Sequence, residues 1–292
     1  MNHRAGFVNI LGNPNVGKST IMNALVGEKL SIITPKVQTT RHRIMGIVNG
    51  DDFQIVYSDT PGIIKPRYKL QESMMSFVNI ALSDADIILY VTEVAERPGE
   101  ENEFINKVRQ SEVPVIVAVN KIDLSNQVAL EQVVKSWEMA FPQAPVIPVS
   151  ALLGFNLDTL LNAITSKLPE SPPYFPKDQL TDKYERFFAS EIIREKILFN
   201  YQKEIPYSVE IEIDSFNNEG GLIKIRALIH VTRDSQKGII IGHKGEKLKT
   251  VGTQARRDME DFFGKKVFLE LYVKVTKDWR DKPRILKRFG YR

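Results

Sequence analysis

The sequence predicts an α/β domain of the P-loop nucleotide-binding class, a mostly parallel sheet covered by helices, followed by a smaller α+β domain. The motif G-x-x-x-x-G-K-[ST] at residues 12–19 directly follows an apolar run at residues 7–11, as its strand-loop-helix order requires. Further Ile- and Val-rich runs lack polar alternation, which is typical of strands buried on both faces. A proline-rich stretch then separates these runs from a basic C-terminal region.

The phosphate loop comes first along the chain. Glycines allow backbone conformations closed to other residues, so that successive N–H groups can point at phosphate oxygens. A helix predicted over residues 18–26 directs its positive N-terminal end at the same phosphates. Lys18 supplies charge to the β- and γ-phosphates, and the Ser19 hydroxyl can ligate Mg²⁺. The predicted nucleotide contacts here are Gly12, Asn13, Pro14, Asn15, Val16, Gly17, Lys18, Ser19 and Thr20.

The next elements alternate between strand and helix. Residues 30–43 are polar and basic and predict an exposed loop. An Asn-Gly pair at 49–50 favours a hairpin between the strands that flank it. Ligands of such sheets bind at the carboxyl ends of the strands, where the remaining motifs also lie. The predicted strands are 43–48, 53–58, 87–91, 113–119 and 146–149, and a helix is predicted over 157–168.

The base-binding motif Asn120-Lys121-Ile122-Asp123 follows one of these strands. The Asp123 carboxylate can accept two hydrogen bonds from the N1–H and N2–H₂ edge of guanine, whereas adenine offers no such pair of donors. A buried carboxylate left unpaired would cost several kcal/mol, so this residue selects GTP over ATP. After the following strand, Ser150, Ala151 and Leu152 are predicted to complete the base pocket.

The motif Asp59-Thr60-Pro61-Gly62 also follows a strand. Asp59 can hold Mg²⁺ through water, and the Gly62 N–H can sense the γ-phosphate. Thr39 and Thr40 lie on the polar loop, where one of them can complete the magnesium ligands once the γ-phosphate is bound. We expect Lys18, Thr40 and Gly62 to contribute to catalysis, with Ser19, Thr40 and Asp59 at the metal.

The second half of the chain predicts a separate domain. We assign residues 1–168 to the nucleotide-binding domain, 169–179 to a stiff proline-rich linker that could alternatively serve as a P-x-x-P peptide ligand, and 180–292 to the α+β domain. Its predicted elements are a helix over 182–201, strands over 207–216 and 222–232 around a turn at 217–221, a short apolar segment over 235–241, a helix to about 263 and a strand over 267–275.

Composition limits the classes of function. The chain has 292 residues, 42% of them hydrophobic, and no cysteine, which excludes disulfides, thiolate zinc sites and cysteine nucleophiles and indicates a reducing compartment. Its apolar stretches are too short to span a bilayer, and the phosphate loop lies too close to the N-terminus for a signal peptide. We therefore expect a cytoplasmic protein.

Charge is distributed unevenly along the chain. Residues 1–169 hold 15 basic and 17 acidic residues, whereas the segment from Arg233 onward holds 17 and 8, a net charge of +9. Such a segment favours a polyanionic partner, with nucleic acid ahead of an anionic membrane surface. A solvated face remains an alternative.

Together these motifs resemble the Era family of GTPases. GNPNVGKS, QTTRHR at 38–43, DTPG, NKID and SAL match its G domain, while SEIIREKI at 190–197, IPYSVEIE at 205–212 and GHKG match its RNA-binding KH domain. The resemblance covers nearly the whole chain. It implies a GTPase that uses Mg²⁺, binds single-stranded 16S ribosomal RNA near its 3′ end and assists assembly of the small (30S) ribosomal subunit, with peripheral association with the inner membrane in some members. In related GTPases the second threonine of the pair, here Thr40, is the metal ligand.

Ile63 stands where many small GTPases carry a glutamine that orients the attacking water. Slow intrinsic turnover is expected, because isoleucine can neither orient nor deprotonate water. Asn15 matches the loop asparagine that helps hold K⁺ in related GTPases; the alternative is an ordinary polar loop residue.

The KH-type loop is Gly242, His243, Lys244 and Gly245, which we expect to clamp single-stranded RNA. The closing run 279–292 interleaves aromatic residues with cations, including Lys287 and Arg288, and predicts base stacking and phosphate contacts or else a disordered basic tail. Two rival functions remain open: a membrane-surface GTPase, and an RNA-binding module that uses the nucleotide only as a structural ligand.

Overall fold

The computed structural model describes residues 3–99 and 103–291 and divides into two compact units. The first unit comprises Met1–Ser31, Thr40–Lys65 and Met74–Asp182, and the second comprises Ile32–Thr39, Pro66–Ser73 and Lys183–Arg292. Two short segments of the N-terminal half therefore pack with the C-terminal half. Among the residues that the structure describes, no helix is long and apolar enough to cross a membrane.

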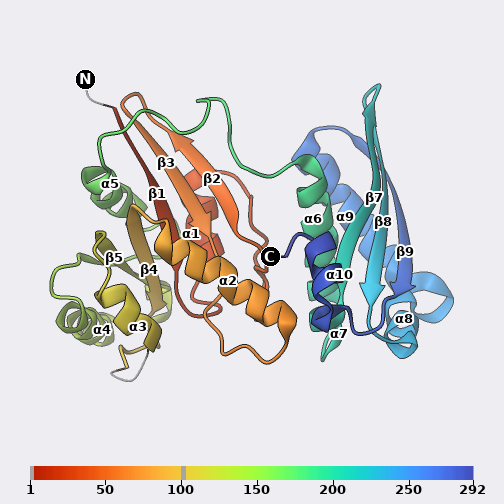
Figure 1. Cartoon of the computed structure of the whole chain (residues 1–292), viewed down its shortest axis with the longest axis horizontal. Coiled ribbons are helices and arrows are strands. Elements are labelled where there is room, and N and C mark those ends of the chain that lie inside the picture. Colours follow the sequence, from red (N-terminus) through yellow and green to blue (C-terminus); the bar gives the residue numbers. More distant parts are fainter. Residues whose placement is uncertain (1–2, 100–102, 292) are drawn as a thin grey trace. The chain divides into compact units, whose positions relative to one another are not determined.

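The first unit contains a six-stranded sheet in the order β2-β3-β1-β4-β5-β6 (Figure 1). Strands β2 and β3 form the antiparallel hairpin, and every other pair in this sheet is parallel. The strands are β1 (Arg4–Leu11), β2 (Ile44–Asn49), β3 (Phe53–Asp59), β4 (Ile87–Glu93), β5 (Val115–Asn120) and β6 (Val146–Pro148). The helices are α1 (Lys18–Val26), α2 (Lys69–Ser83), α3 (Glu103–Arg109), η1 (Ile122–Leu124), α4 (Gln127–Ala140) and α5 (Leu157–Lys167).

The core of this unit forms where helices cover the Ile- and Val-rich strands. Nearly all of β4 is buried, as expected of a strand covered on both faces. Trp137 of α4 is 1% exposed and packs against Tyr90, with ring centroids 5.6 Å apart. Because β1, β3, β4 and β5 run parallel, their carboxyl ends meet at one edge of the sheet, which brings the sequence motifs together.

The second unit is an α+β domain built on a three-stranded sheet in the order β7-β8-β9. Strands β7 and β8 are antiparallel, and β8 and β9 are parallel. Its elements are α6 (Glu185–Asn200), α7 (Ile205–Ser208), β7 (Glu210–Glu219), β8 (Leu222–Val231), α8 (Asp234–Ile241), η2 (His243–Gly245), α9 (Glu246–Phe263), β9 (Lys266–Val275), η3 (Trp279–Asp281) and α10 (Pro283–Arg288). The predicted fold class is confirmed.

The hairpin of the second unit differs from the prediction. Its turn consists of two residues, Gly220 and Gly221, with φ of 58° and 85°, and not of the five residues 217–221. Two consecutive residues with positive φ match a type I′ turn, whose twist fits the flanking strands. Residues 217–219 consequently extend β7 and pair with β8.

The proline-rich stretch 169–179 is bound to the first unit along part of its length. The side-chain oxygen of Gln54 accepts hydrogen bonds from the N–H groups of Tyr174 (2.7 Å) and Phe175 (3.0 Å). The Thr181 hydroxyl donates to the Met45 carbonyl at 2.6 Å. The first unit therefore extends to Asp182, and α6 begins at Glu185, because the residues before it still complete the edge of the first sheet.

The closing run is folded over its described residues 279–291, so the interpretation as a disordered tail is wrong; Arg292 lies outside the described residues. Trp279 is fully buried and its indole N–H donates to the Ser208 carbonyl at 3.0 Å. Tyr291 is 2% exposed. These two aromatic rings pack inside the domain, so the predicted base stacking does not apply to them.

Candidate nucleotide-binding site and RNA interface

The phosphate loop between β1 and α1 depends on its glycines. Gly12 and Gly17 have φ of 150° and 96°, and Asn15 also has a positive φ of 65°. A Cβ atom at Gly12 would lie 2.1 Å from the Val91 carbonyl oxygen, and one at Gly17 would lie 2.2 Å from the Asn120 amide nitrogen. Both conformation and space therefore require glycine, as a loop of inward-pointing N–H groups demands.

Lys18 is buried at the first position of α1. Its ammonium donates hydrogen bonds to the carbonyls of Gly12 (3.1 Å) and Asn13 (2.8 Å), so it lies within the loop. Burial lowers the pKa of Lys18 to about 8, and the negative charges of Asp59 and Glu96 act in the opposite direction. A bound triphosphate would add negative charge beside Lys18 and so favour its charged form.

Ser19, Thr40 and Asp59 converge at the carboxyl end of β3. Asp59 Oδ2 accepts a hydrogen bond from the Ser19 hydroxyl at 2.6 Å and one from Thr40 at 3.3 Å, and the two hydroxyl oxygens are 2.9 Å apart. Asp59 Oδ1 is buried with no hydrogen-bond partner among the described residues. Burial raises the pKa of Asp59, and the hydrogen bond from Ser19 partly offsets this. Two hydroxyls and a carboxylate with an unpaired oxygen suit Mg²⁺, which prefers oxygen ligands.

The two neighbouring threonines have different surroundings. The Thr39 hydroxyl lies 2.6 Å from that of Thr34 and donates to the Lys36 carbonyl at 2.5 Å, so it is used within its own loop. The Thr40 hydroxyl instead faces Ser19 and Asp59. This geometry favours Thr40 as the metal ligand, and its role stays a prediction.

Asn120 connects the two nucleotide-binding loops. Its amide nitrogen donates to the Val16 carbonyl of the phosphate loop at 2.9 Å, and its oxygen accepts from the Ala151 N–H at 3.0 Å. Asp123 is exposed, and its Oδ1 accepts a hydrogen bond from the buried Ser150 hydroxyl at 2.5 Å. The carboxylate is thus oriented from one side while it remains accessible to a base.

Gly62 and Ile63 lie against the phosphate loop. A Cβ atom at Gly62 would lie 2.7 Å from Pro14 Cα, so only glycine allows this approach. The Ile63 N–H donates to the Gly12 carbonyl at 3.2 Å, and its side chain packs against the apolar core behind β4 and β5. Ile63 therefore contributes apolar packing next to the predicted γ-phosphate site.

Sequence reasoning missed Glu96, which follows β4. Its carboxylate accepts hydrogen bonds from Asn13 (2.9 Å) and Thr92 (2.8 Å) and raises the pKa of Lys18. It therefore supports the phosphate loop from outside. Only its position shortly after a strand end could have drawn attention to it.

In the second unit, the predicted KH-type loop joins α8 to α9. Gly242, Lys244 and Gly245 have φ of 72°, 47° and 81°, and His243 and Lys244 are exposed. The loop leads into the N-terminus of α9, a helix of 18 residues whose dipole favours a phosphate at this end. His243 and Lys244 are thus accessible, and their contact with a nucleic-acid backbone stays a prediction.

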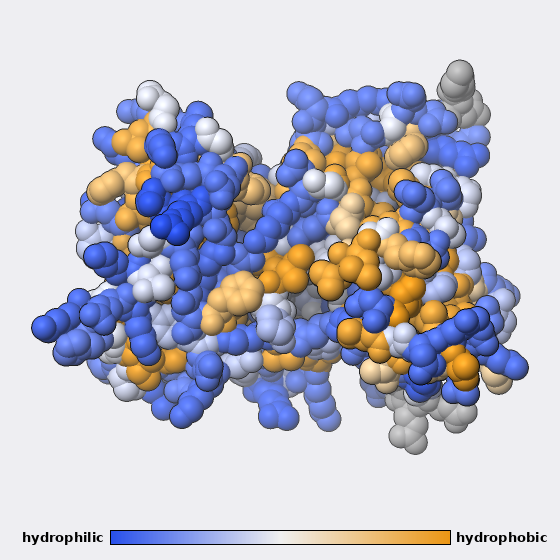
Figure 2. All heavy atoms as spheres, turned by 180° about the vertical axis from the view of Figure 1, so that it is seen from behind, coloured by the Kyte–Doolittle hydropathy of each residue, from blue (hydrophilic) through white to orange (hydrophobic). Residues whose placement is uncertain are grey.

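A groove of about 390 Å³ lies beside this loop, between α9 and β9. It has an apolar floor and basic or polar walls. An apolar groove beside the loop was expected, but its lining residues were not identified from the sequence, although those on the helix recur every three or four residues. Figure 2 shows that the second unit, on the left of that view, is largely hydrophilic on the face drawn. The groove is lined by Gly245, Leu248, Lys249, Gly252, Thr253, Arg256, Leu269 and Leu271.

The two predicted basic contacts on α10 differ. Lys287 is exposed. Arg288 is also exposed, but its Nε donates to Glu212 Oε1 at 2.8 Å, so part of its charge is already paired. Lys287 is therefore the better candidate for a phosphate contact.

Comparison with known proteins identifies both domains. The family model described as 50S ribosome-binding GTPase matches residues 7–121, and the KH domain model matches residues 204–280. The chain is 44% identical over 294 residues to GTPase Era of Alkaliphilus metalliredigens, covering 100% of both chains. It is 45% identical over 291 residues to GTPase Era of Geobacter metallireducens, covering 99% of this chain and 98% of that one.

Two solved structures are similar over the whole chain. One is a crystal structure of Era in complex with MgGDPNP and nucleotides 1506–1542 of 16S ribosomal RNA, and the other is a single-residue variant of Aquifex aeolicus Era bound to GDP and AlF₄⁻. Each has a TM-score of 0.94 and 39% sequence identity and covers 99% of both chains.

Proposed function

We propose that this chain, which belongs to the GTPase Era family, binds single-stranded 16S ribosomal RNA near the 3′ end and assists assembly of the small ribosomal subunit. The chain is a GTP-hydrolysing P-loop enzyme with a C-terminal KH domain. The observation that carries the proposal is the KH-type loop opening α9 beside a groove, in a chain 39% identical to an Era that was solved with this RNA.

The first unit supports hydrolysis of GTP to GDP and phosphate. Water attacks the γ-phosphorus, the bond to the β–γ bridging oxygen breaks, and GDP leaves with that oxygen. The loop N–H groups and Lys18 would stabilise charge on the transferred group, and the Gly62 N–H would contact the γ-phosphate. Ser19 and Thr40 would hold Mg²⁺ directly and Asp59 would hold it through water, and the bound ion would supply further charge neutralisation. Turnover is slow, because Ile63 cannot orient the attacking water.

Potassium is a second proposed ion. Asn15 lies in the phosphate loop with a positive φ of 65°. It occupies the position of the asparagine that helps hold K⁺ in related GTPases. Its test compares hydrolysis in KCl and NaCl at equal ionic strength. A several-fold preference for KCl that Asn15→Ala abolishes supports the ion, and equal rates contradict it.

The second unit supports RNA binding. The exposed backbone between Gly242 and Gly245 can contact about four nucleotides, and the adjacent groove can receive their bases. Lys249 and Arg256 on its wall are suited to phosphate or base contacts. Lys287 adds charge outside the groove.

The decisive experiment measures the affinity of the full chain for an oligonucleotide of the 16S 3′ end, against a scrambled oligonucleotide of the same length. Preference for the ribosomal sequence, together with crosslinking to the 16S 3′ end in cells, is the expected result. Equal binding of both oligonucleotides would contradict the proposed partner. Depletion of the protein in cells should then lower the yield of mature small subunits on sucrose gradients.

A cytoplasmic location and peripheral membrane association are also proposed, the latter from the net charge of +9 that the segment from Arg233 onward carries. Flotation with anionic vesicles, with and without competing RNA, tests the membrane association. RNA that displaces the protein from vesicles would indicate one shared basic surface.

A further inference from the structure

Arg194 is a buried cation in the middle of α6. Its side chain is 1% exposed, its Nε donates to Glu191 Oε1 at 2.7 Å, and its Nη2 donates to Glu191 Oε2. Burial disfavours its charged form, but the carboxylates of Glu191 and Glu210 more than compensate and raise its pKa. Arg194 therefore remains charged at any physiological pH.

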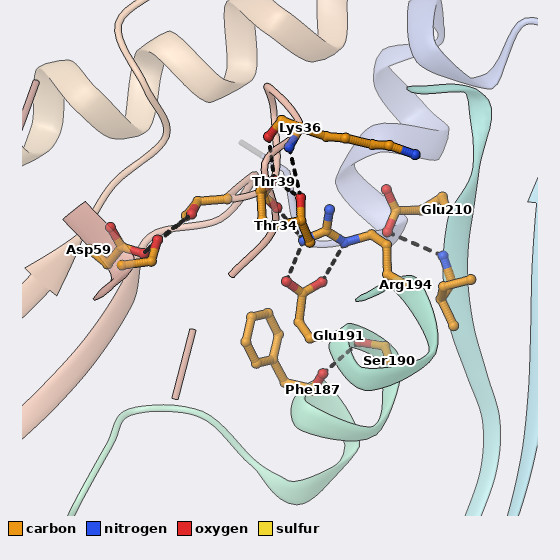
Figure 3. Close-up of polar contacts among 12 residues, drawn as sticks. Thr34, Lys36, Thr39, Asp59, Phe187, Ser190, Glu191, Arg194 and Glu210 are labelled. Atoms are coloured by element: carbon orange, nitrogen blue, oxygen red, sulfur yellow. Dashed lines mark hydrogen bonds and ion pairs between the residues drawn. The ribbon is translucent and has the colours of Figure 1, made fainter. Parts of the chain in front are cut away.

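The Arg194 guanidinium also holds a piece of the polar loop. Its Nη2 donates a hydrogen bond to the Thr39 carbonyl at 2.5 Å, and Figure 3 shows the guanidinium between this carbonyl and Glu191. Thr39 ends the segment Ile32–Thr39, which packs with the second unit. A buried charged donor aimed at a backbone carbonyl fixes that peptide group more firmly than a neutral one would.

Lys36 attaches the same segment at another point. Its ammonium donates to the carbonyls of Leu198 and Tyr201, at the C-terminal end of α6. These carbonyls lie where a helix leaves acceptors unsatisfied and where its dipole favours a cation. Two cations, one from α6 and one from the loop, thus hold Ile32–Thr39 against one helix.

The Thr39 carbonyl belongs to the peptide bond that leads into Thr40. A peptide group is planar, so fixing its carbonyl also fixes the direction of the Thr40 N–H and limits where Thr40 Cα can lie. The Thr40 hydroxyl oxygen lies 2.9 Å from the Ser19 hydroxyl oxygen and 3.3 Å from Asp59 Oδ2. Arg194 is therefore one peptide bond away from a proposed metal ligand.

We propose that Arg194, oriented by Glu191, is a positioning residue for GTP hydrolysis: it holds the Thr39 carbonyl so that the Thr40 hydroxyl can join Ser19 and Asp59 at the metal. The inference rests on the proposed function, because it needs Thr40 to act at the metal. It makes hydrolysis in the first unit depend on a side chain of the KH-containing unit. An Arg194 that served only to neutralise Glu191 within α6 would not need its bond to Thr39.

The test compares Arg194→Gln and Arg194→Lys with the wild-type full chain. Lysine keeps the charge but cannot reach Glu191 and Thr39 together with one planar group. At saturating Mg²⁺ we expect the turnover rate to fall by about tenfold or more in both variants, with the KM for GTP changed less than about twofold, because the residues that bind the phosphates and the base are unchanged. Lys196→Gln is the matched control: Lys196 lies on the same helix as Arg194, and it pairs with Glu195 of α6 and Asp258 of α9 and not with the loop.

Two further measurements separate positioning from mere structural support. With a GTP analogue bound, amide hydrogen exchange over residues 38–42 should be faster in the Arg194 variants than in the wild type or the Lys196 control. The Mg²⁺ concentration for half-maximal binding should rise with the GTP analogue and not with GDP. RNA affinity equal to the wild type shows that the KH fold is intact.

Wild-type turnover, exchange and Mg²⁺ dependence in the Arg194 variants would overturn the proposal. If those variants fail to fold, Lys36→Met decides, because it releases the same segment from a half-buried position: slower turnover with faster exchange supports the proposal, and no change contradicts it. Thr40→Ala is measured in parallel. A Thr40→Ala enzyme with normal turnover refutes the proposed metal site itself, which is a different failure.

Discussion

Asn120 illustrates how one side chain can organise a site through backbone groups. Both ends of its amide are used, one on the Val16 carbonyl and the other on the Ala151 N–H. The residue therefore joins the phosphate loop to the loop after β6. Its motif indicates base binding, and the structure adds this connection.

Asp123→Asn is expected to shift nucleotide preference away from GTP by about 2–4 kcal/mol, because a carboxylate that accepts two hydrogen bonds becomes an amide that cannot accept both. The Ser150 hydroxyl can still donate to the amide oxygen, so the loop should keep its shape. Competition binding with GTP measures the shift. Xanthosine triphosphate, which has an oxygen in place of the guanine amino group, should bind the variant better than the wild type; unchanged competition by GTP would remove Asp123 from the site.

The lowered pKa of Lys18 predicts that GTP binding depends on pH. Its pKa is lowered to about 8 in the nucleotide-free protein, and bound phosphates favour the charged form. Affinity should therefore be full well below pH 8 and fall as pH rises through that value. With a pKa of 8, about a quarter of Lys18 is charged at pH 8.5, so affinity should fall about fourfold from pH 7.

Isothermal titration in two buffers with different ionisation enthalpies checks the cause of this fall. Proton uptake on binding at pH 8.5, absent at pH 6.5, is expected. Equal affinities at pH 7 and 8.5 would show that Lys18 is already charged in the free protein.

At the scale of elements, α9 combines two functions. Its N-terminus receives the KH-type loop, and one of its faces forms a wall of the groove with β9. Gly252 lies on that face, where a Cβ atom would come within 3.3 Å of Leu271 Cδ1. The missing side chain therefore allows the helix and strand to approach closely beneath the groove.

Gly242→Asp combined with Gly245→Asp should abolish binding of single-stranded RNA while GTP affinity survives. The new side chains block close approach of the RNA backbone and repel its phosphates. Anisotropy of a labelled oligonucleotide measures the loss. A Cβ atom at Gly242 would contact Lys247 Cβ at 2.9 Å, so circular dichroism must accompany the measurement.

The matched control places aspartate at Gly220 and Gly264. Both have positive φ and open surroundings in the same domain, so the control adds the same charge and similar backbone strain away from the loop. Equal loss of RNA binding in both double variants would mean that charge alone, and not the loop, is responsible.

At the scale of the whole molecule, charge separates the two functions. The C-terminal segment from Arg233 carries a net charge of +9, whereas residues 1–169 carry a net charge of −2. Binding of a polyanion therefore belongs to the second unit, and its affinity should depend strongly on salt.

The logarithm of RNA affinity should fall linearly with the logarithm of salt concentration, and Lys287→Ala should reduce the slope by about 0.7, the value for one phosphate contact on a single strand. Arg288→Ala should reduce it less, because Arg288 is paired with Glu212. Lys135→Ala, an exposed lysine on α4 of the first unit, is the control and should leave the slope unchanged. Identical slopes for Lys287→Ala and the control would exclude Lys287 from the interface.

Local sequence patterns were sufficient to predict much of the fold and to bring the nucleotide-binding motifs to one site. Uninterrupted Ile and Val runs identified the buried strands, and glycines in conformations closed to other residues were expected at the phosphate loop. Parallel strands bring their carboxyl ends to one edge of the sheet, so motifs that follow separate strands could be assigned to one site from their order alone. The α/β domain followed by an α+β domain, and the family, followed from the same local signals.

Tertiary structure alone decided contacts between segments far apart in the chain. The polar loop around Thr39 carries no apolar pattern, and Arg194 lies on a helix 155 residues later, yet the two are joined by a hydrogen bond. Likewise the aromatic residues of the closing run suggested stacking on bases, whereas Trp279 and Tyr291 are buried. Composition shows which side chains a segment contains. Tertiary structure decides which groups those side chains contact, because a buried cation or aromatic ring is stable only where the surrounding chain supplies its hydrogen bonds and packing.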